Sequence, residues 1–439
     1  MRFLSNLLLR TDSYKLSHAQ QYPAGTETVY SYFEARKGSQ FDSITFFGLQ
    51  HLLKKHLAGQ VVTQEKIDAA DALSRIHLGS DSIFNRAGWQ HILDVHDGKL
   101  PLRIRAATEG ATYDVGDVLM TVENTDPACF WLTNYVETLL THVWFPTTVA
   151  TLGTSARGLL IDWLKETGCE TGGVEFMLHD FGFRGVSSVE AAGIGGLAHL
   201  INFKGTDTIE AIATGIDYYD SGICGFSIPA SEHSTITSWG EENEVEAYRN
   251  MLKAYPTGIM ACVSDSYDIL HACDLWGTVL KDEVLARDGV LVVRPDSGPP
   301  KATTLAVLRR LAQHFGAEKN EKGFLVLNPK VRVIWGDGID LDGMDDVLNA
   351  MCREGWAAEN IAFGMGGGLL QKHSRDTLNV AFKCCAIQVN GEWRDVYKTS
   401  PGKESKRGRV GEHLPIVFEN GRIDRLYDFS QVRANAREA

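Results

Sequence analysis

The chain lacks the cysteine spacing, the long apolar runs and the leader-like start that mark several protein classes. None of its eight cysteines stands in a CxxC pair, and Cys384 and Cys385 are adjacent, which is too close for an ordinary disulfide between them. This pattern predicts reduced thiols rather than a disulfide framework or a zinc site. No apolar stretch reaches membrane-spanning length, and residues 1–12 hold a short apolar run without a cleavage-like site of small residues. We therefore expect a cytoplasmic protein without a signal peptide or a membrane partner.

An excess of positive charge is also lacking. The formal net charge is -13 over 439 residues, which argues against a general surface for nucleic acid or for anionic membranes. Hydrophobic residues make up 44% and charged residues 23% of the chain, as in ordinary soluble globular proteins. The length alone predicts two or three domains. Any phosphate site must therefore be a local positive patch on a negative molecule.

What the chain does contain is a repeated pattern of strand, polar loop and helix. Three of the clearest strand ends are GVLVVRPDSG (289–298), VRVIWGDGID (331–340) and NIAFGMGGGLL (360–370). Four more are found at 179–185, 202–207, 226–235 and 263–268, and helical patterns follow most of them. Seven such units predict an irregular β/α barrel, in which the loops after the strands gather on one face.

The two ends of the chain have a different texture. Residues 27–36 and 100–127 contain short β-like runs broken by glycine, aspartate and proline, and the tail after about residue 385 is β-like again. We therefore predict an α/β protein of two domains. Residues 1–145 plus 386–439 would form a mixed, mostly-β domain with linking helices, and residues 146–385 the barrel that carries the active site.

The loops share a chemistry that suits a sugar phosphate. Glycine-loop N–H groups cradle phosphate oxygens, Arg294 can fork onto an anion, and Asp296 and Asp337 can hold a metal or a ribose hydroxyl. The glycine run GMGGG (364–368) precedes a segment that can start a helix, which is typical of a phosphate site. The alternative is a tight turn whose glycines adopt positive φ.

His233 stands at an apparent strand end, beside Glu232 and among hydroxyl side chains. A neighbouring carboxylate can orient an imidazole and raise its basicity, which makes His233 a candidate for catalysis, although a lone histidine is more often structural. The basic run KESKRGR (403–409) is either a solvated surface loop or a loop that closes over pyrophosphate.

Two further candidates flank the first strands of the predicted barrel. Phe181 and Arg184 offer an aromatic platform beside a guanidinium group, or else belong to a core strand and a solvated turn. Asp207 is either a helix N-cap or an acceptor for a ligand amide.

Long distinctive stretches connect these residues to a known family. They are TDSYKLSH (11–18), QYPAGTETVYSYFEAR (21–36), VENTDPACFWLTN (122–134), LHDFGFRGVSSVEAAGIGGLAHLINFKGTDT (178–208), PASEHSTIT (229–237), VSDSYDI (263–269), RPDSG (294–298), GDG (336–338) and AFGMGGGLLQKHSRD (362–376). Through them the chain closely resembles, nearly end to end, the nicotinamide phosphoribosyltransferases, which are type II phosphoribosyltransferases. The connections 36–46 and 391–403 are shorter than in the animal enzymes, which suggests a bacterial or phage-type member.

The resemblance implies a function that spacing alone does not supply. Such enzymes join nicotinamide to 5-phosphoribosyl 1-pyrophosphate with Mg²⁺, giving nicotinamide mononucleotide and pyrophosphate for NAD salvage. They use ATP as a co-substrate through a phosphorylated histidine, which matches His233 here. They work as homodimers that share active sites.

The resemblance also implies the site residues. Implied as catalytic are His233, Asp296 and Asp268. Implied as nicotinamide-binding are Phe181, Tyr14 of the partner subunit, Asp207, Arg294, Ser227 and Arg184. Implied as binding ribose or phosphate are Gly336, Asp337, Gly366, Gly367, Arg375, Arg36, Lys383, Lys403 and Arg409. No protein ligand for the metal is implied, since Mg²⁺ would be held mainly through pyrophosphate.

Three rival functions stay open at this point. A nicotinate phosphoribosyltransferase is the nearest, but a carboxylate ligand would be repelled by Asp207, which favours the amide. A barrel aldolase would form a Schiff base through Lys204 or Lys383. A non-catalytic binding or signalling protein on the same fold would be expected to have a damaged site, whereas the family positions that we can match are intact.

Overall fold

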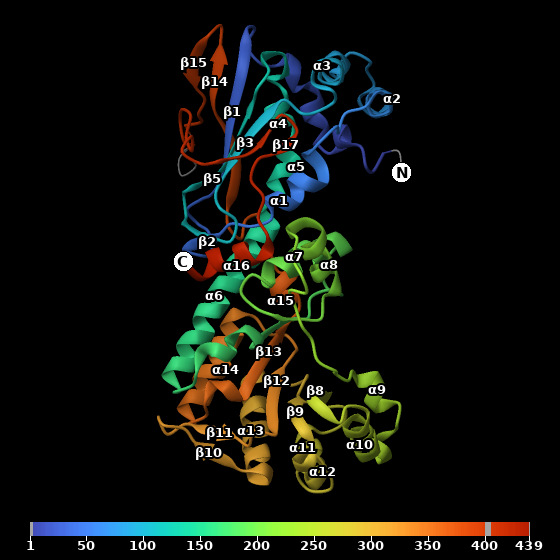
Figure 1. The fold of residues 1–439 in the computed structure, drawn as a ribbon, viewed down its shortest axis with the longest axis vertical. Helices are drawn as coiled ribbons and strands as arrows, with labels where there is room; N and C mark the ends of the chain where they lie inside the picture. Colours follow the sequence, from blue (N-terminus) through green and yellow to red (C-terminus); the bar gives the residue numbers. More distant parts are fainter. Residues whose placement is uncertain (1–2, 400–404, 439) are drawn as a thin grey trace. The chain divides into compact units, whose positions relative to one another are not determined.

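The computed structural model describes residues 3–399 and 405–438. The chain divides into two compact units (Figure 1). The first comprises Met1–Thr151, Gly215–Ser221 and His373–Ala439, and the second comprises Leu152–Thr214 and Gly222–Lys372. Two helices, α6 (Trp144–Glu166) and α8 (Ile209–Tyr219), each contribute residues to both units.

The first unit is built on a seven-stranded antiparallel sheet in the order β15-β14-β1-β5-β3-β16-β17. Its strands are β1 (Thr26–Ala35), β3 (Leu102–Ala106), β5 (Val118–Asn124), β14 (Val380–Val389), β15 (Glu392–Asp395), β16 (Ile416–Glu419) and β17 (Arg422–Ile423), and β2 (Ser43–Thr45) pairs separately with β4 (Thr112–Asp114). Strand β1 lies between β14 and β5 and is buried along most of its length, which explains its run of aromatic residues.

Short helices cover the core of this unit. They are η1 (Leu7–Leu9), η2 (Ser13–Gln20), α1 (Leu49–Leu52), η3 (Leu53–Leu57), α2 (Gln64–Leu78), α3 (Arg86–His96), η4 (Pro127–Cys129), α4 (Leu132–Tyr135), α5 (Glu137–Thr141) and α16 (Phe429–Glu438). Trp89 of α3 and Trp131 are buried there and meet edge to face at a centroid distance of 4.8 Å. Aromatic packing therefore fixes α3 against the segment that follows η4.

The second unit is built on a six-stranded parallel sheet in the order β7-β6-β13-β12-β9-β8. The strands are β6 (Leu178–Asp180), β7 (Gly205–Thr206), β8 (Thr257–Val263), β9 (Asp288–Arg294), β12 (Val331–Trp335) and β13 (Ile361–Met365), with a separate hairpin of β10 (Ala317–Lys319) and β11 (Leu325–Leu327). Both edges of the sheet bond to one segment, through the parallel bridges Gly205–Phe226 and Ala230–Ala261. This segment closes the sheet, and the predicted irregular β/α barrel is confirmed.

Helices connect these strands and precede the first of them. They are η5 (Thr171–Phe176), α7 (Val189–His199), α9 (His233–Thr237), η6 (Glu241–Asn243), α10 (Glu244–Ala254), α11 (Ile269–Gly277), α12 (Lys281–Ala286), α13 (Pro300–Phe315), α14 (Leu341–Arg353), η7 (Ala358–Asn360) and α15 (Gly367–Leu370). Helices α11, α13 and α14 pack side by side along the sheet (Figure 1). Proline at the start of α13 and Gly316 with φ 87° at its end set that helix's limits.

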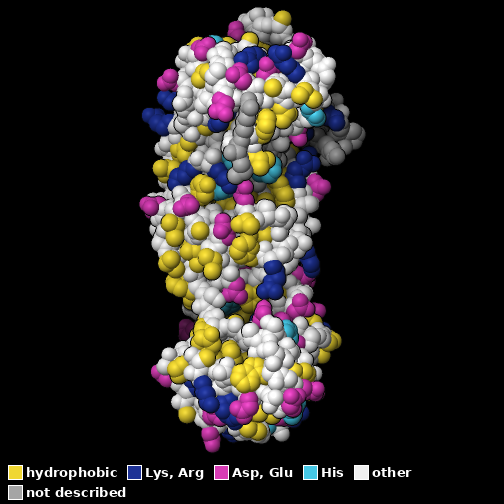
Figure 2. Space-filling model, turned by 90° about the vertical axis from the view of Figure 1, so that its right-hand side faces the viewer, with side chains coloured by type: hydrophobic (Ala, Val, Ile, Leu, Met, Phe, Trp, Pro, Cys, Tyr) yellow, Lys and Arg dark blue, Asp and Glu magenta, His cyan; other side chains and the backbone are white. Residues whose placement is uncertain are grey.

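The surface shows the mixture of charged and apolar side chains that the composition predicts. On the face shown in Figure 2, acidic, basic and apolar side chains are all distributed over the surface. Within 3–399 and 405–438, no helix combines the length and the apolar character needed to cross a bilayer.

Candidate active site

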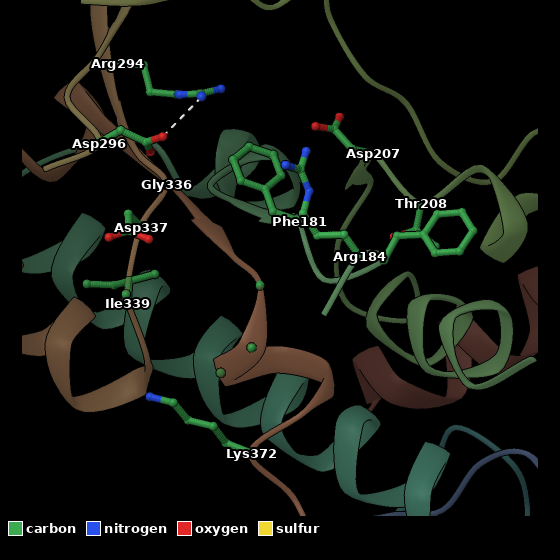
Figure 3. Close-up of a pocket in the computed structure, with 15 residues that line it drawn as sticks. Phe181, Arg184, Asp207, Thr208, Arg294, Asp296, Gly336, Asp337, Ile339 and Lys372 are labelled. Carbon is green, nitrogen blue, oxygen red and sulfur yellow. Dashed lines mark hydrogen bonds and ion pairs between the residues drawn. The ribbon is translucent and has the colours of Figure 1, made fainter. Parts of the chain in front are cut away.

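A cavity of about 770 Å³ opens in the second unit (Figure 3). It is lined by Phe181, Phe183, Arg184, Asp207, Thr208, Arg294, Asp296, Gly336, Asp337, Gly338, Ile339, Gly366, Gly367, Gly368 and Lys372. Nearly all of these residues lie at or just beyond the carboxyl ends of the parallel strands β6, β7, β9, β12 and β13. Loops far apart in sequence thus meet on the face where barrel enzymes hold their substrates.

The aromatic wall of the cavity is Phe181, whose amide donates to the carbonyl of Met365 at 3.0 Å. Its ring lies directly over glycines of two neighbouring strand ends. A Cβ at Gly364 would stand 2.0 Å from the ring, and one at Gly336 would stand 3.2 Å from it. These positions need glycine because the ring approaches the backbone so closely. The half-buried ring presents a flat apolar surface to the cavity.

Asp207 lies across the cavity from the Arg294–Asp296 pair in the view of Figure 3. Its Oδ1 accepts a hydrogen bond from the Ser227 hydroxyl at 2.5 Å, and its own amide donates to the carbonyl of Asp180 at 3.0 Å. The sequence left open whether Asp207 is an N-cap or a ligand acceptor. Its exposed carboxylate in the cavity fits the second interpretation.

Asp180 is the last residue of β6 and directly precedes Phe181. It is fully buried, and its Oδ1 accepts a hydrogen bond from the amide of Gly182 at 2.7 Å. Burial raises the pKa of Asp180 to about 6, even though backbone and side-chain hydrogen bonds lower it. The carboxylate fixes the start of the loop that carries Phe181. Sequence reasoning did not choose it, because a carboxylate within a strand motif carries no sign of burial.

Arg294 pairs with Asp296, with 3.2 Å between Nη2 and Oδ2. Its buried Nε has no hydrogen-bond partner among the described residues. A buried N–H without a partner costs free energy, so this side chain is suited to donate a hydrogen bond to an anionic or carbonyl oxygen of a ligand.

The glycine loop after β13 leads into α15, which is a single turn. None of the glycines from 364 to 368 adopts positive φ, so the interpretation of this run as a positive-φ turn is wrong. Close packing requires at least one of them: a Cβ at Gly368 would lie 2.7 Å from the carbonyl oxygen of Ile339. The first amides of a helix have no intrahelical acceptor, and Lys372 adds a positive charge at the cavity wall. The loop can therefore hold a phosphate group.

His233 begins α9, and its partner is a residue that sequence reasoning missed. Its Nε2 lies 3.1 Å from Oδ1 of Asp265, whose Oδ2 accepts from the amide of Asp296 at 3.1 Å. The side chain of Asp265 is only 3% exposed, whereas that of His233 is 47% exposed. A buried carboxylate thus joins the exposed imidazole to a residue of the cavity wall.

The expectation that Glu232 orients His233 is wrong. Glu232 is the N-cap of α9, where it forms a capping box with Thr235 and accepts from the Ser234 hydroxyl. Asp268 is also a cap: its Oδ1 accepts from the first amides of α11 at 2.8 and 2.9 Å. Sequence proximity pointed to Glu232, while the VSDSYD motif contained the true partner, Asp265, without marking it.

The remaining implied residues belong to the first unit. They are Tyr14, Arg36, Arg375, Lys383 and Arg409. Tyr14 is 62% exposed on η2, and Arg36 donates from Nε and Nη2 to Asn379 at 3.0 and 2.9 Å. Lys403 lies outside the described residues.

Comparisons with known proteins show which families the chain is similar to. The sequence pattern of the nicotinate phosphoribosyltransferase family matches residues 176–422, and that of the nicotinamide phosphoribosyltransferase N-terminal domain matches residues 6–104. The chain is 47% identical to a nicotinamide phosphoribosyltransferase of Xanthomonas campestris pv. campestris, with 100% of each covered. It is 34% identical to one of Acinetobacter baylyi, covering 96% of this chain and 95% of that protein.

Solved structures show the same fold. The nicotinate-nucleotide pyrophosphorylase from Pyrococcus furiosus aligns with a TM-score of 0.60 at 13% identity, covering 99% of this chain and 96% of that one. Human nicotinic acid phosphoribosyltransferase aligns with a TM-score of 0.59 at 16% identity, covering 98% and 93%. The type II phosphoribosyltransferase fold implied by the sequence is confirmed.

Proposed function

The chain belongs to the nicotinamide phosphoribosyltransferase family, and we propose that it joins nicotinamide to 5-phosphoribosyl 1-pyrophosphate, forming nicotinamide mononucleotide and pyrophosphate in NAD salvage. The observation that carries this function is the 47% identity over the full length of a nicotinamide phosphoribosyltransferase. The cavity agrees with it, because one wall is aromatic and its loops offer a guanidinium, carboxylates and glycine amides.

The cavity suits nicotinamide in particular. The pyridine ring lies against Phe181, and the carboxamide N–H donates to Asp207, whose Oδ1 is already oriented by Ser227. The ring nitrogen is then held toward the anomeric carbon of the ribose. Because that nitrogen is a weak neutral nucleophile, positioning contributes much of the rate. The new C–N bond forms as the C–O bond to pyrophosphate breaks.

Positive charge at the end of the cavity formed by the glycine loop stabilises the phosphates of the substrate. Amides of Gly366 and Gly367, with Lys372 nearby, bind the 5-phosphate, while Asp337 binds ribose hydroxyls. Mg²⁺ prefers carboxylate and phosphate oxygens, and Asp296 and Asp337 supply carboxylates at the cavity wall, so the donor set fits this ion. When bound with pyrophosphate, Mg²⁺ neutralises the negative charge of the leaving group.

Coupling to ATP hydrolysis is proposed to run through His233, with Asp296 and Asp268 as the further catalytic residues that the resemblance implies. With Nε2–H donating to Asp265, the lone pair of the imidazole is at Nδ1. Nδ1 attacks the γ-phosphorus of ATP and the bond to the ADP oxygen breaks. Asp265 keeps the proton on Nε2 and stabilises the charged ring.

The active unit is proposed to be a cytoplasmic homodimer in which Tyr14 of the partner subunit covers the second face of the pyridine ring. Neither nucleic acid nor a membrane is a partner. The exposed aromatic ring of Tyr14 on η2 is compatible with such a role.

Mass spectrometry of the products tests the function directly. Nicotinamide and phosphoribosyl pyrophosphate should give nicotinamide mononucleotide, and ATP should raise its yield. Nicotinate offered in competition should react far more slowly. A preference for nicotinate would assign the chain to the rival activity, and the absence of either mononucleotide would overturn the proposal.

A further inference from the structure

A group of metal-binding side chains lies in the first unit, apart from the residues that line the active-site cavity. It consists of His91 and His96 on α3 and Asp126 and Cys129 at η4, and their ligand atoms all lie within 4.8 Å of one another. We propose that these four side chains bind a zinc ion that links the end of α3 to the η4 turn.

The two imidazoles converge on one oxygen. Nε2 of His91 lies 2.8 Å and Nε2 of His96 lies 2.7 Å from the same Oδ2 of Asp126, and the ring planes meet at 70°. Zinc bonds of about 2.0–2.3 Å place tetrahedral ligand atoms about 3.3–3.8 Å apart. The separations in the cluster, from 2.7 to 4.8 Å, span this range. Small side-chain movements therefore convert the cluster into a tetrahedral site.

The η4 turn holds the carboxylate and the thiol on the same side. Oδ1 of Asp126 accepts from the amide of Ala128 at 2.9 Å, and the amide of Cys129 donates to the carbonyl of Asp126 at 2.9 Å. These bonds leave Oδ2 directed at the histidines. The chain does not need to reorganise its backbone to present both ligands.

Burial differs across the cluster in a way that suits a metal site. Cys129 is fully buried, and its thiol is a free one, outside any disulfide. The side chains of His91 and His96 are 34% and 25% exposed. A divalent ion can thus enter past the imidazoles and reach the thiol in its apolar surrounding. Binding of the ion releases the thiol proton, and the sulfur then binds the metal as a thiolate.

The ligand types select the metal and its role. Two imidazoles, a thiolate and a carboxylate form a mixed set that favours zinc over Mg²⁺ or Ca²⁺, which take oxygen ligands. Four protein ligands leave no open coordination position, so the ion would be structural. Without a metal, the same residues are only a hydrogen-bonded cluster of two histidines on one carboxylate.

Metal content of the full-length protein decides between these two states. After incubation with zinc chloride and exhaustive dialysis, elemental analysis should find one zinc per chain. Cys129→Ser and His91→Gln should each lower retained zinc by about tenfold or more. Cys352→Ser and His142→Gln, at residues outside the cluster, should retain it.

Cobalt supplies a second, spectroscopic readout. Co²⁺ bound to the wild-type protein should show a thiolate charge-transfer band that Cys129→Ser abolishes and Cys352→Ser preserves. His91→Gln keeps the core thiol and should remain folded by circular dichroism, so a folding defect of Cys129→Ser does not block the test. Zinc lost entirely on dialysis, or retained equally by the cluster variants, would overturn the proposal.

Discussion

Three aspartates near the ends of parallel strands illustrate how surroundings assign different tasks to one type of side chain. Asp180 is buried and holds the amide that starts the Phe181 loop. Asp207 is exposed in the cavity and bonds the Ser227 hydroxyl. Asp265 is almost buried and connects His233 to the cavity wall. Each role leads to a distinct experiment.

Asp207→Asn should weaken the preference for nicotinamide over nicotinate. The charged carboxylate accepts from an amide N–H and repels a carboxylate ligand, and asparagine removes the repulsion. We expect the ratio of kcat/KM for the two substrates to fall by about tenfold. Asp337→Asn is the matched control, because ribose contacts affect both substrates equally. An unchanged ratio in Asp207→Asn would show that selectivity arises elsewhere.

Asp265→Asn should slow ATP hydrolysis by about 100-fold while the fold is retained. One oxygen becomes a donor nitrogen, which conflicts with either the His233 Nε2–H or the Asp296 amide that the carboxylate now accepts. The measurement is the rate at which acid-labile label appears on the protein during incubation with γ-labelled ATP. Asp268→Asn should have a smaller effect, because asparagine also caps helices. Equal losses in both variants would assign the orienting role to Asp268 as well.

Asp180→Asn should flatten the dependence of stability on pH. The folded pKa of about 6 lies above the ordinary 3.8, so the native state binds the extra proton between these values. Stability from this group is therefore lost as pH rises from about 4 to about 6, by up to about 3 kcal/mol. Urea midpoints from pH 4 to 8 should show the variant gaining on wild type as pH rises. Asp162→Asn, at an exposed position on α6, should follow wild type.

At the scale of elements, the site depends on short strands that have glycine at or just beyond their carboxyl ends. The ring of Phe181, on the loop after β6, fits over Gly336, just beyond β12, and Gly364, in β13, because neither has a side chain. Helix α15 is a single turn, so its dipole is small and the loop amides must supply most of the contact with phosphate. The geometry of the cavity is therefore set by strand ends rather than by long helices.

Gly364→Ala should raise KM for nicotinamide by about tenfold or more with little change in the KM for phosphoribosyl pyrophosphate. The added Cβ would stand 2.0 Å from the ring of Phe181 and must push it into the cavity. Gly173→Ala, where an added Cβ meets nothing within 4 Å, is the control. Steady-state kinetics on both variants provides the comparison. Equal KM for nicotinamide in the two would mean that the ring does not bind the substrate.

At the scale of the whole molecule, the resemblance implies shared active sites in a homodimer. Tyr14→Ala and His233→Ala chains should each be inactive alone. In a mixed dimer, one of the two sites combines the intact His233 of one chain with the intact Tyr14 of the other, so the mixture should recover roughly a quarter of wild-type activity at most. The assay follows mononucleotide formation after subunit exchange, which is verified with differently labelled chains. Exchange without recovery would show that each chain completes its own site.

The sequence by itself determined the family, the barrel and most of the residues that line the cavity. Strand periodicity and glycine or aspartate punctuation are local signals, and long motifs such as 178–208 are recognisable without a structure. Only the tertiary structure decided which residues meet. His233 pairs with Asp265, 32 positions away, and not with the adjacent Glu232, because closure of the barrel brings separate loops together. The group of His91, His96, Asp126 and Cys129 was equally hidden, since the packing of α3 against η4 sets the distances between its two pairs of residues.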